Sequence, residues 1–170
     1  MATTLSANVK MSVVAKLHND SLDIGNADYN VNEVVYKAFT NGATTGLANA
    51  LWTDERTIGI SADDDIDFSG GITDAFGTSL ALTAIKAIMI EANANNTVSL
   101  IVGGDTTTNL VGLFGTDTDT MLIKPGASQC LLMPTTGYPV TAATADKLRF
   151  TNSSGAATIS YKISVIGVKA

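Results

Sequence analysis

Hydrophobic and polar residues alternate most clearly near the C-terminal end of the sequence. In the segment ATISYKISVIGVKA (157–170), apolar side chains occupy every second position from Ile159 to Val165, with serine and lysine between them. A period of two is typical of a β-strand with one buried face and one wet face. The segment DKLRF (146–150) alternates in the same way, and TNSSGAA (151–157) between them is rich in turn-forming residues. We therefore predict an antiparallel hairpin over residues 146–170.

Shorter apolar runs precede this hairpin. DTMLIKPG (119–126) and ASQCLLM (127–133) meet at Pro125-Gly126, a dipeptide that favours a tight turn, so they predict a second hairpin. TVSLIVGG (97–104) and TNLVGLFG (108–115) predict two further strands. SLALTAIKAIMIEANANN (79–96) contains good helix formers, but its strand-like neighbours and its isoleucines favour a strand.

The first third of the chain contains three more strand candidates. They are VKMSVVAKL (9–17), NEVVYKAFT (32–40) and LANALWTDERTIGI (47–60), and Asn41-Gly42 is a strong turn signal before the last of them. Met1 to Asn8 are expected to form a short flexible N-terminal arm. With many short strands and no persuasive helix, we predict an all-β fold, in which residues 9–170 form a single antiparallel β-sandwich with jelly-roll topology.

Composition and charge narrow the function classes. The 170 residues suffice for one domain, and only 15% of them are charged, which leaves a surface rich in threonine, serine and asparagine. The net charge of -6, without a basic stripe, argues against nucleic-acid binding. The absence of a long apolar run and of a secretory leader predicts synthesis in a cytoplasm without a membrane partner.

Acidic residues are the main candidates for chemistry. ADDDIDF (62–68) holds four aspartates, and on a strand Asp65 and Asp67 share a face and could converge on a cation, whereas Asp64 points away. A solvated strand entry or a charged sheet edge explains the same residues. Asp117 and Asp119 in GTDTDTM (115–121) resemble the start of a calcium loop, but the glycine and the closing glutamate do not follow.

No constellation for nucleophilic catalysis is present. Cys130 is the single cysteine and is expected to be a small core hydrophobe, and His18, the single histidine, lies in an unrelated context. Trp52 is expected in the core or at one end of the sandwich, with an exposed binding position as the alternative. We therefore predict no catalytic residues, no metal ligands and no cofactor.

One glycine-rich segment, DFSGGITDAFGTSL (67–80), raises the question of a ligand loop. We interpret it as the connection between a short acidic strand and a long core strand. In this interpretation Gly70 and Gly71 supply positive φ angles, and Phe76 packs the loop against the sandwich.

Several motifs, taken in order, resemble a family of small virion structural proteins of tailed bacteriophages. They are ADDDIDFSGGITDAFG, the apolar run ending in VGG, the KPGA turn, GYPVTAATADKLRFTNSSGAA and the terminal YKISVIG, and they extend from about Leu51 to Val168. The resemblance implies a β-sandwich component of a phage particle without catalytic residues or cofactor.

Three functional hypotheses follow. The first is a capsid decoration, or cement, protein that binds the major capsid protein on the outer head surface as a homo-oligomer, with a trimer as the expected form. The second is a tail or head-fibre component that acts as an adsorption or receptor-binding module. The third is a glycan-degrading enzyme that uses Asp64, Asp65 or Asp67.

Overall fold

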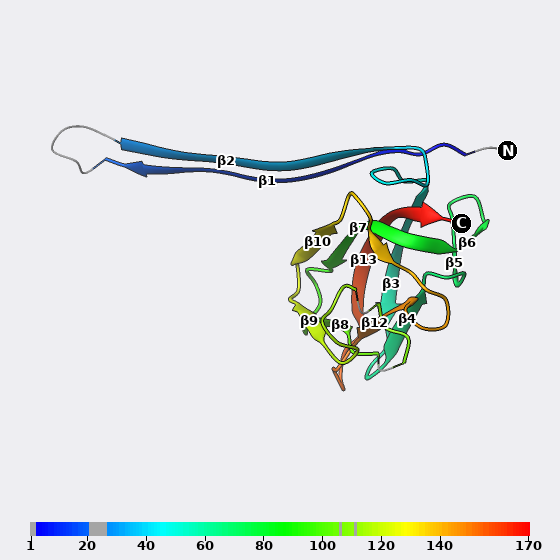
Figure 1. The fold of residues 1–170 in the computed structure, drawn as a ribbon. Helices are drawn as coiled ribbons and strands as arrows, with labels where there is room; N and C mark the ends of the chain where they lie inside the picture. The colour runs from blue at the N-terminus through cyan, green and yellow to red at the C-terminus, as the bar shows by residue number, and fades with distance from the viewer. Residues whose placement is uncertain (1–2, 21–26, 106, 111) are drawn as a thin grey trace.

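The computed structural model describes residues 3–20, 27–105, 107–110 and 112–170, and within them strands joined by turns and loops are the only regular secondary structure (Figure 1). The strands, in chain order, are β1 (Ser6–Asn19), β2 (Ala27–Thr40), β3 (Ala50–Ile58), β4 (Asp63–Asp67), β5 (Ile72–Thr73), β6 (Ser79–Leu80), β7 (Leu82–Ala92), β8 (Leu100–Gly103), β9 (Thr120–Ile123), β10 (Ser128–Leu132), β11 (Tyr138–Pro139), β12 (Lys147–Thr151) and β13 (Ile159–Lys169). The predicted all-β fold class is confirmed.

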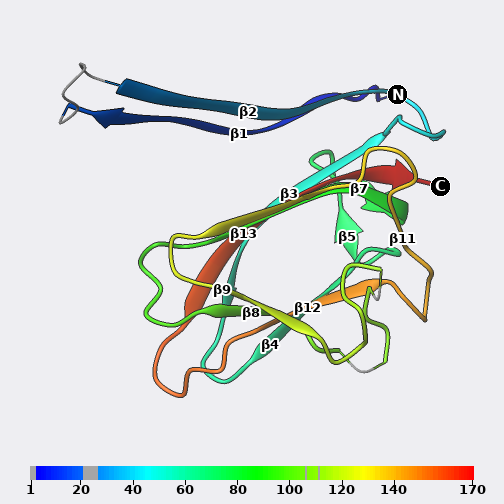
Figure 2. The same ribbon diagram turned by 60° about the vertical axis from the view of Figure 1, so that its left-hand side comes forward.

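Two antiparallel sheets face one another across one core (Figure 2). The larger has the order β10-β7-β13-β3, with β11 also paired to β7, and the smaller has the order β4-β12-β8-β9. Figure 2 shows these as the upper and lower layers of the sandwich. The predicted antiparallel sandwich is therefore present, and the jelly-roll topology stays a prediction.

The core lies between the two sheets and follows the alternation of the strands. Ile159, Tyr161, Ile163 and Val165 point from β13 into the core, as their period of two predicts. From the smaller sheet, Phe150 stacks on Tyr161 with ring centroids 4.3 Å apart. This aromatic contact links the two layers across the core.

The predicted hairpin over residues 146–170 is wrong. β12 pairs with β4 and β8, whereas β13 pairs with β3 and β7, so the two strands lie in opposite sheets. The connection between them, residues 152–158, passes from one layer to the other. The alternating pattern identified the buried face of each strand correctly, but a strand buries the same face whether its neighbour in sequence lies beside it or across the core.

The predicted hairpin at Pro125-Gly126 is wrong for the same reason. β9 pairs with β8 in the smaller sheet, and β10 pairs with β7 in the larger. In place of the strand predicted for residues 108–115, the described residues 108–110 and 112–115 form turns and one isolated bridge, between Asn109 and Lys147. The preference for a strand within residues 79–96 is confirmed, because β7 occupies Leu82–Ala92 at the centre of the larger sheet.

β1 and β2 form a long hairpin that pairs with neither sheet (Figure 1). Their register runs from Ser6 opposite Thr40 to Asn19 opposite Ala27, with 14 residues in each strand. Within the predicted arm of residues 1–8, Ser6 to Asn8 belong to β1, and residues 1–2 lie outside the described residues. The strands of the sandwich itself start at β3.

Candidate functional site

The hairpin of β1 and β2 exposes apolar side chains on both of its faces. Residues paired across the hairpin share a face, so the register divides its side chains into two sets. One face carries Val13, Leu17, Tyr29 and Val35, and the other carries Val14, Val34 and Tyr36. Leu17 and Tyr29, which are direct partners, are 71% and 68% exposed. We call the outer portions of the two strands, residues 13–19 and 27–35, the distal hairpin.

The inner end of the hairpin rests on the sandwich. Phe39 of β2 is buried in a small apolar cluster with Ala48, Ala87 and Ile166, and Leu5, Ala7, Val9 and Leu132 pack against this cluster. Ala7, Val9 and Phe39 lie on the same hairpin face as Leu17 and Tyr29. One mainly apolar face, interrupted by Glu33 and Lys37, is therefore covered at its inner end and uncovered in the distal hairpin.

The surface beneath the hairpin is the outer face of the larger sheet. The pairing aligns Leu132, Ala87, Ile166 and Leu51 across its four strands, and Cys130, Met89, Ser164 and Thr53 form the next row. A groove of about 410 Å³ separates this face from the hairpin, with Val9 and Met11 on one wall and Met89, Cys130 and Ile166 on the other. We call this the hairpin groove. Met89 is 40% exposed although it lies in the central part of the sheet.

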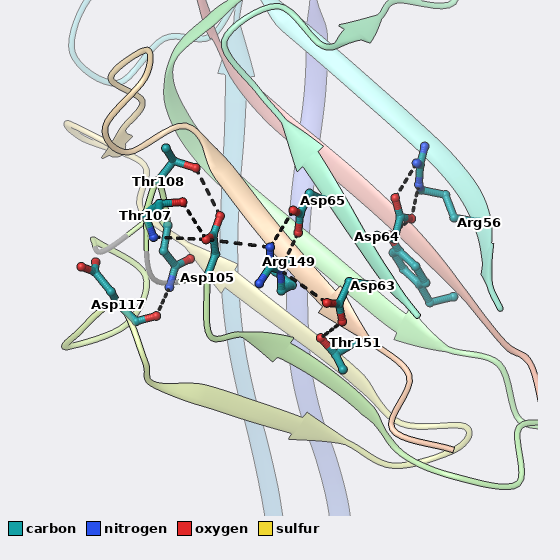
Figure 3. A network of polar contacts seen from close by, with 12 residues as sticks. Arg56, Asp63, Asp64, Asp65, Asp105, Thr107, Thr108, Asp117, Arg149 and Thr151 are labelled. Atoms are coloured by element: carbon teal, nitrogen blue, oxygen red, sulfur yellow. Dashed lines mark hydrogen bonds and ion pairs between the residues drawn. The ribbon is translucent and has the colours of Figure 1, made fainter. Parts of the chain in front are cut away.

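The acidic strand β4 is engaged in ion pairs within the chain (Figure 3). Asp64 accepts two hydrogen bonds from the Arg56 guanidinium, at 2.5 and 2.7 Å, and a third from the Tyr161 hydroxyl at 2.8 Å. Burial raises the pKa of Asp64, but the hydrogen bonds from Arg56 and Tyr161 outweigh burial and hold that pKa below its ordinary value. Burial, followed by the bond to Asp64, raises the pKa of Tyr161.

The guanidinium of Arg149, on β12, lies close to three further carboxylates of this region. It donates to both oxygens of Asp65, at 2.7 and 2.8 Å, and lies 4.0 Å from Asp63 and 3.9 Å from Asp105 (Figure 3). Asp63 also accepts a hydrogen bond from Thr151 at 2.5 Å. Asp65 therefore faces Arg149 in place of the cation considered from the sequence.

The remaining carboxylate candidates stabilise turns. Asp67 accepts hydrogen bonds from the backbone N–H and the hydroxyl of Ser69, both at 2.7 Å. Asp119 accepts from the backbone N–H of Thr116 at 2.7 Å, and the side chain of Asp117 is exposed. Within the described part of the chain, no three histidine, cysteine or acidic residues form a group able to hold a metal ion.

Cys130 and His18 do not meet in the structure. Cys130 lies half-buried on the outer face of β10 and lines the hairpin groove, so its predicted core position is wrong. Burial raises the pKa of its thiol, which disfavours the reactive thiolate at neutral pH. His18 lies near the end of β1, where its Nδ1 is 2.5 Å from a carboxylate oxygen of Asp28.

Trp52 occupies the predicted core position. It is buried and meets Phe68 edge to face with ring centroids 6.0 Å apart. The predicted role of Phe76 is wrong, because its side chain is 79% exposed. The turn that carries it is held by Asp74, which accepts hydrogen bonds from the backbone N–H groups of Phe76 and Thr78 at 2.9 Å. The segment also contains the small β5–β6 hairpin, and of its glycine pair only Gly70 has a positive φ.

A second groove, of about 510 Å³, lies beside this turn. Its lining includes Trp52, Asp54, Asp74 and Phe76, together with the described N-terminal residues from Thr3 to Ser6. Asp54 accepts a hydrogen bond from Arg56 at 3.0 Å. An exposed aromatic ring next to carboxylates is a surface suited to a sugar ring. We call this the Phe76 groove.

The distal hairpin is the feature that the sequence analysis did not identify. A signal for it existed, because Val13-Val14 and Val34-Val35-Tyr36 are consecutive apolar residues within strands. Neighbouring residues in a strand point to opposite faces, so such runs predict a strand that is apolar on both faces. In this hairpin neither sheet of the sandwich covers those faces.

Comparison with known proteins found no matching family model, no matching curated protein and no matching solved structure. No helix in the described part of the chain is able to cross a membrane.

Proposed function

We propose that this protein is a structural assembly protein, and specifically a capsid decoration protein of a tailed bacteriophage that binds the outer head surface and stabilises contacts between capsid subunits. The observation that carries the proposal is the exposed distal hairpin. Of the twelve large hydrophobic side chains exposed in the described residues, seven lie on β1 and β2. Contiguous exposed apolar surface of this kind marks a site of protein association.

The low stability expected of an uncovered hairpin supports this role. A two-stranded ribbon by itself is marginally stable in water, because most of its apolar side chains remain hydrated. The distal hairpin becomes favourable when a second surface covers it, and that surface would be the major capsid protein or another copy of this chain. On a capsid lattice many such contacts form at the same time, so contacts that are weak one by one together give firm attachment.

The polar groups also support assembly over catalysis. Asp64 forms an ion pair with Arg56, and Asp65 forms one with Arg149. Asp67 accepts hydrogen bonds within a turn. A catalytic carboxylate must be available to substrate, whereas these three already accept hydrogen bonds within their own chain.

The test is co-sedimentation with undecorated heads of a phage that encodes this chain. We expect saturation at a fixed ratio close to one copy per capsid subunit, and loss of binding in the double variant Leu17→Asn/Tyr29→Asn. The matched control is Leu122→Asn, because Leu122 is 60% exposed on β9, in the smaller sheet. Absence of saturable binding would remove the decoration hypothesis.

A second function is favoured by the Phe76 groove. A tail or head-fibre adsorption module would bind a host glycan there, with the Phe76 ring packed against a sugar. A glycan array should then give hits that Phe76→Ala abolishes and Leu122→Asn does not. An array without hits would argue against adsorption through this groove.

A further inference from the structure

The exposed apolar surface of this chain has two parts that already contact one another. The inner end of the hairpin packs on Ala87 and Ile166 of the larger sheet, so the chemistry of the hairpin face and of the sheet face is compatible. The same hairpin face continues outward as Val13, Leu17 and Tyr29 without cover. The same sheet face continues as Met89 and Cys130, which line the open hairpin groove.

We propose that the distal hairpin of one copy occupies the hairpin groove of a second copy. Each chain carries both halves of the contact, so each copy can give one hairpin and receive another. Such an exchange closes either as a reciprocal pair or as a ring, depending on the rotation between copies. The proposal does not depend on the capsid role, since it concerns contacts between copies alone.

Charge on the two surfaces fits this occupant. On the distal hairpin, Lys16 is 2.8 Å from Asp28, so this pair needs no charged partner. The hairpin groove is lined mainly by apolar and neutral side chains, and Lys10 is the one charged residue among those of its lining that are described. The face with Leu17 and Tyr29 carries one charged residue in the distal hairpin, Glu33, and the groove lining offers the opposite charge of Lys10.

The native cysteine provides a direct test. Cys130 lies on the groove wall opposite Met11, and Leu17 lies six residues farther out along β1, which corresponds to roughly 20 Å of strand. A disulfide requires Cα atoms within about 7 Å, so a cysteine at position 17 is too far along the strand to reach Cys130 of its own chain easily. Its natural partner is Cys130 of a neighbouring copy.

The experiment oxidises purified full-length Leu17→Cys protein mildly and separates the products by non-reducing electrophoresis. We expect disulfide-linked species, which are a dimer alone for a reciprocal pair and a ladder that starts at the dimer for a ring. These crosslinked species should disappear when Cys130→Ser is added, and Leu122→Cys, which places a thiol on the opposite sheet, should not give them.

Each other outcome contradicts the proposal. A disulfide-linked dimer that persists with Cys130→Ser would mean that two hairpins contact one another. A monomeric intrachain disulfide would mean that the hairpin folds onto its own sheet. If wild-type protein sediments as a monomer at every concentration tested and Leu17→Cys gives no crosslink, there is no exchange, whatever the outcome with phage heads.

Discussion

The carboxylate of Asp64 links the smaller sheet to the larger sheet through hydrogen bonds with one charged residue and one aromatic residue. It lies on β4, and its partners Arg56 and Tyr161 belong to β3 and β13 of the facing sheet. Its side chain is 16% exposed, against 47% for Asp63 and 32% for Asp65. The hydrogen bonds of Asp64 therefore tie the two layers together at a point that water reaches poorly.

Replacement of Asp64 by asparagine should lower the free energy of unfolding by about 1–3 kcal/mol at neutral pH, because the Arg56 guanidinium loses its charged acceptor. Urea unfolding measures the change. Asp117→Asn is the matched control, since the Asp117 side chain is exposed, and it should leave stability within about 0.5 kcal/mol of wild type. Equal effects of the two substitutions would contradict the assigned role of Asp64.

The same carboxylate makes a pH-dependent contribution. The pKa of Asp64 in the folded protein lies below its ordinary value of 3.8, so the folded state binds its proton less readily than the unfolded state. The stabilisation is fully present above pH 3.8 and is lost as the pH falls through the lowered folded value. Thermal unfolding measured from neutral pH downward should show a smaller acid destabilisation in Asp64→Asn than in wild type. An identical acid limb in both proteins would overturn this assignment.

At the scale of elements, the faces of the strands were predictable from the sequence and their partners were not. The pattern of β13 placed Tyr161 and Ile163 in the core, where they lie. The same pattern gave no information on whether β12 lies beside β13 or opposite it, because local alternation records burial and not pairing. For the candidate site, the sequence indicated the aspartates of residues 62–68, which ion pairs and a turn engage, whereas consecutive apolar residues in β1 and β2 were the signal for the hairpin.

The turn between β12 and β13 is held by one buried side chain. Asn152 donates to the carbonyl oxygens of Gly59 and Ala157, both at 2.8 Å, and accepts from the backbone N–H of Ser154 at 2.9 Å. Asn152→Ala should lower the free energy of unfolding by about 1–3 kcal/mol, because the turn loses the three hydrogen bonds of this buried amide. Denaturant titration measures this effect, and the neighbouring exposed Ser153→Ala should be nearly silent. A silent Asn152→Ala would show that other contacts hold the crossing.

The hairpin and the central strands should differ in backbone protection. Amides of the distal hairpin are paired in a ribbon of two strands, whereas β7 and β13 each pair on both sides within a sheet. Hydrogen exchange of the dissociated protein should therefore be fast in residues 13–19 and 27–35 and slow in β7 and β13. Assembly should slow the hairpin selectively. Uniform protection of all these strands in the dissociated protein would contradict this prediction.

At the scale of the whole molecule, the sandwich has a core of its own. All buried residues of the main core cluster lie at or after Ala50, and Phe39 belongs to a separate small cluster. Deletion of residues 1–40 should leave a cooperatively folded β-protein that is about 1–3 kcal/mol less stable, because Ala87 and Ile166 lose their cover. Circular dichroism with thermal denaturation measures this, and the shortened protein should no longer self-associate. Loss of cooperative unfolding would show that the hairpin is part of the folding unit.

The position of β13 fixes the order in which the parts of the molecule can form. β13 stands between β7 and β3 in the larger sheet, and Ile58 of β3 finds its partner only in Ile159. During synthesis β3 therefore stays unpaired in its sheet until β13 has left the ribosome. The hairpin of β1 and β2 can begin to pair once residues 6–40 have emerged, but it is only marginally stable until the larger sheet supports its inner end. Until then its apolar side chains are open to contact between nascent chains on one messenger RNA, before their sandwiches have formed.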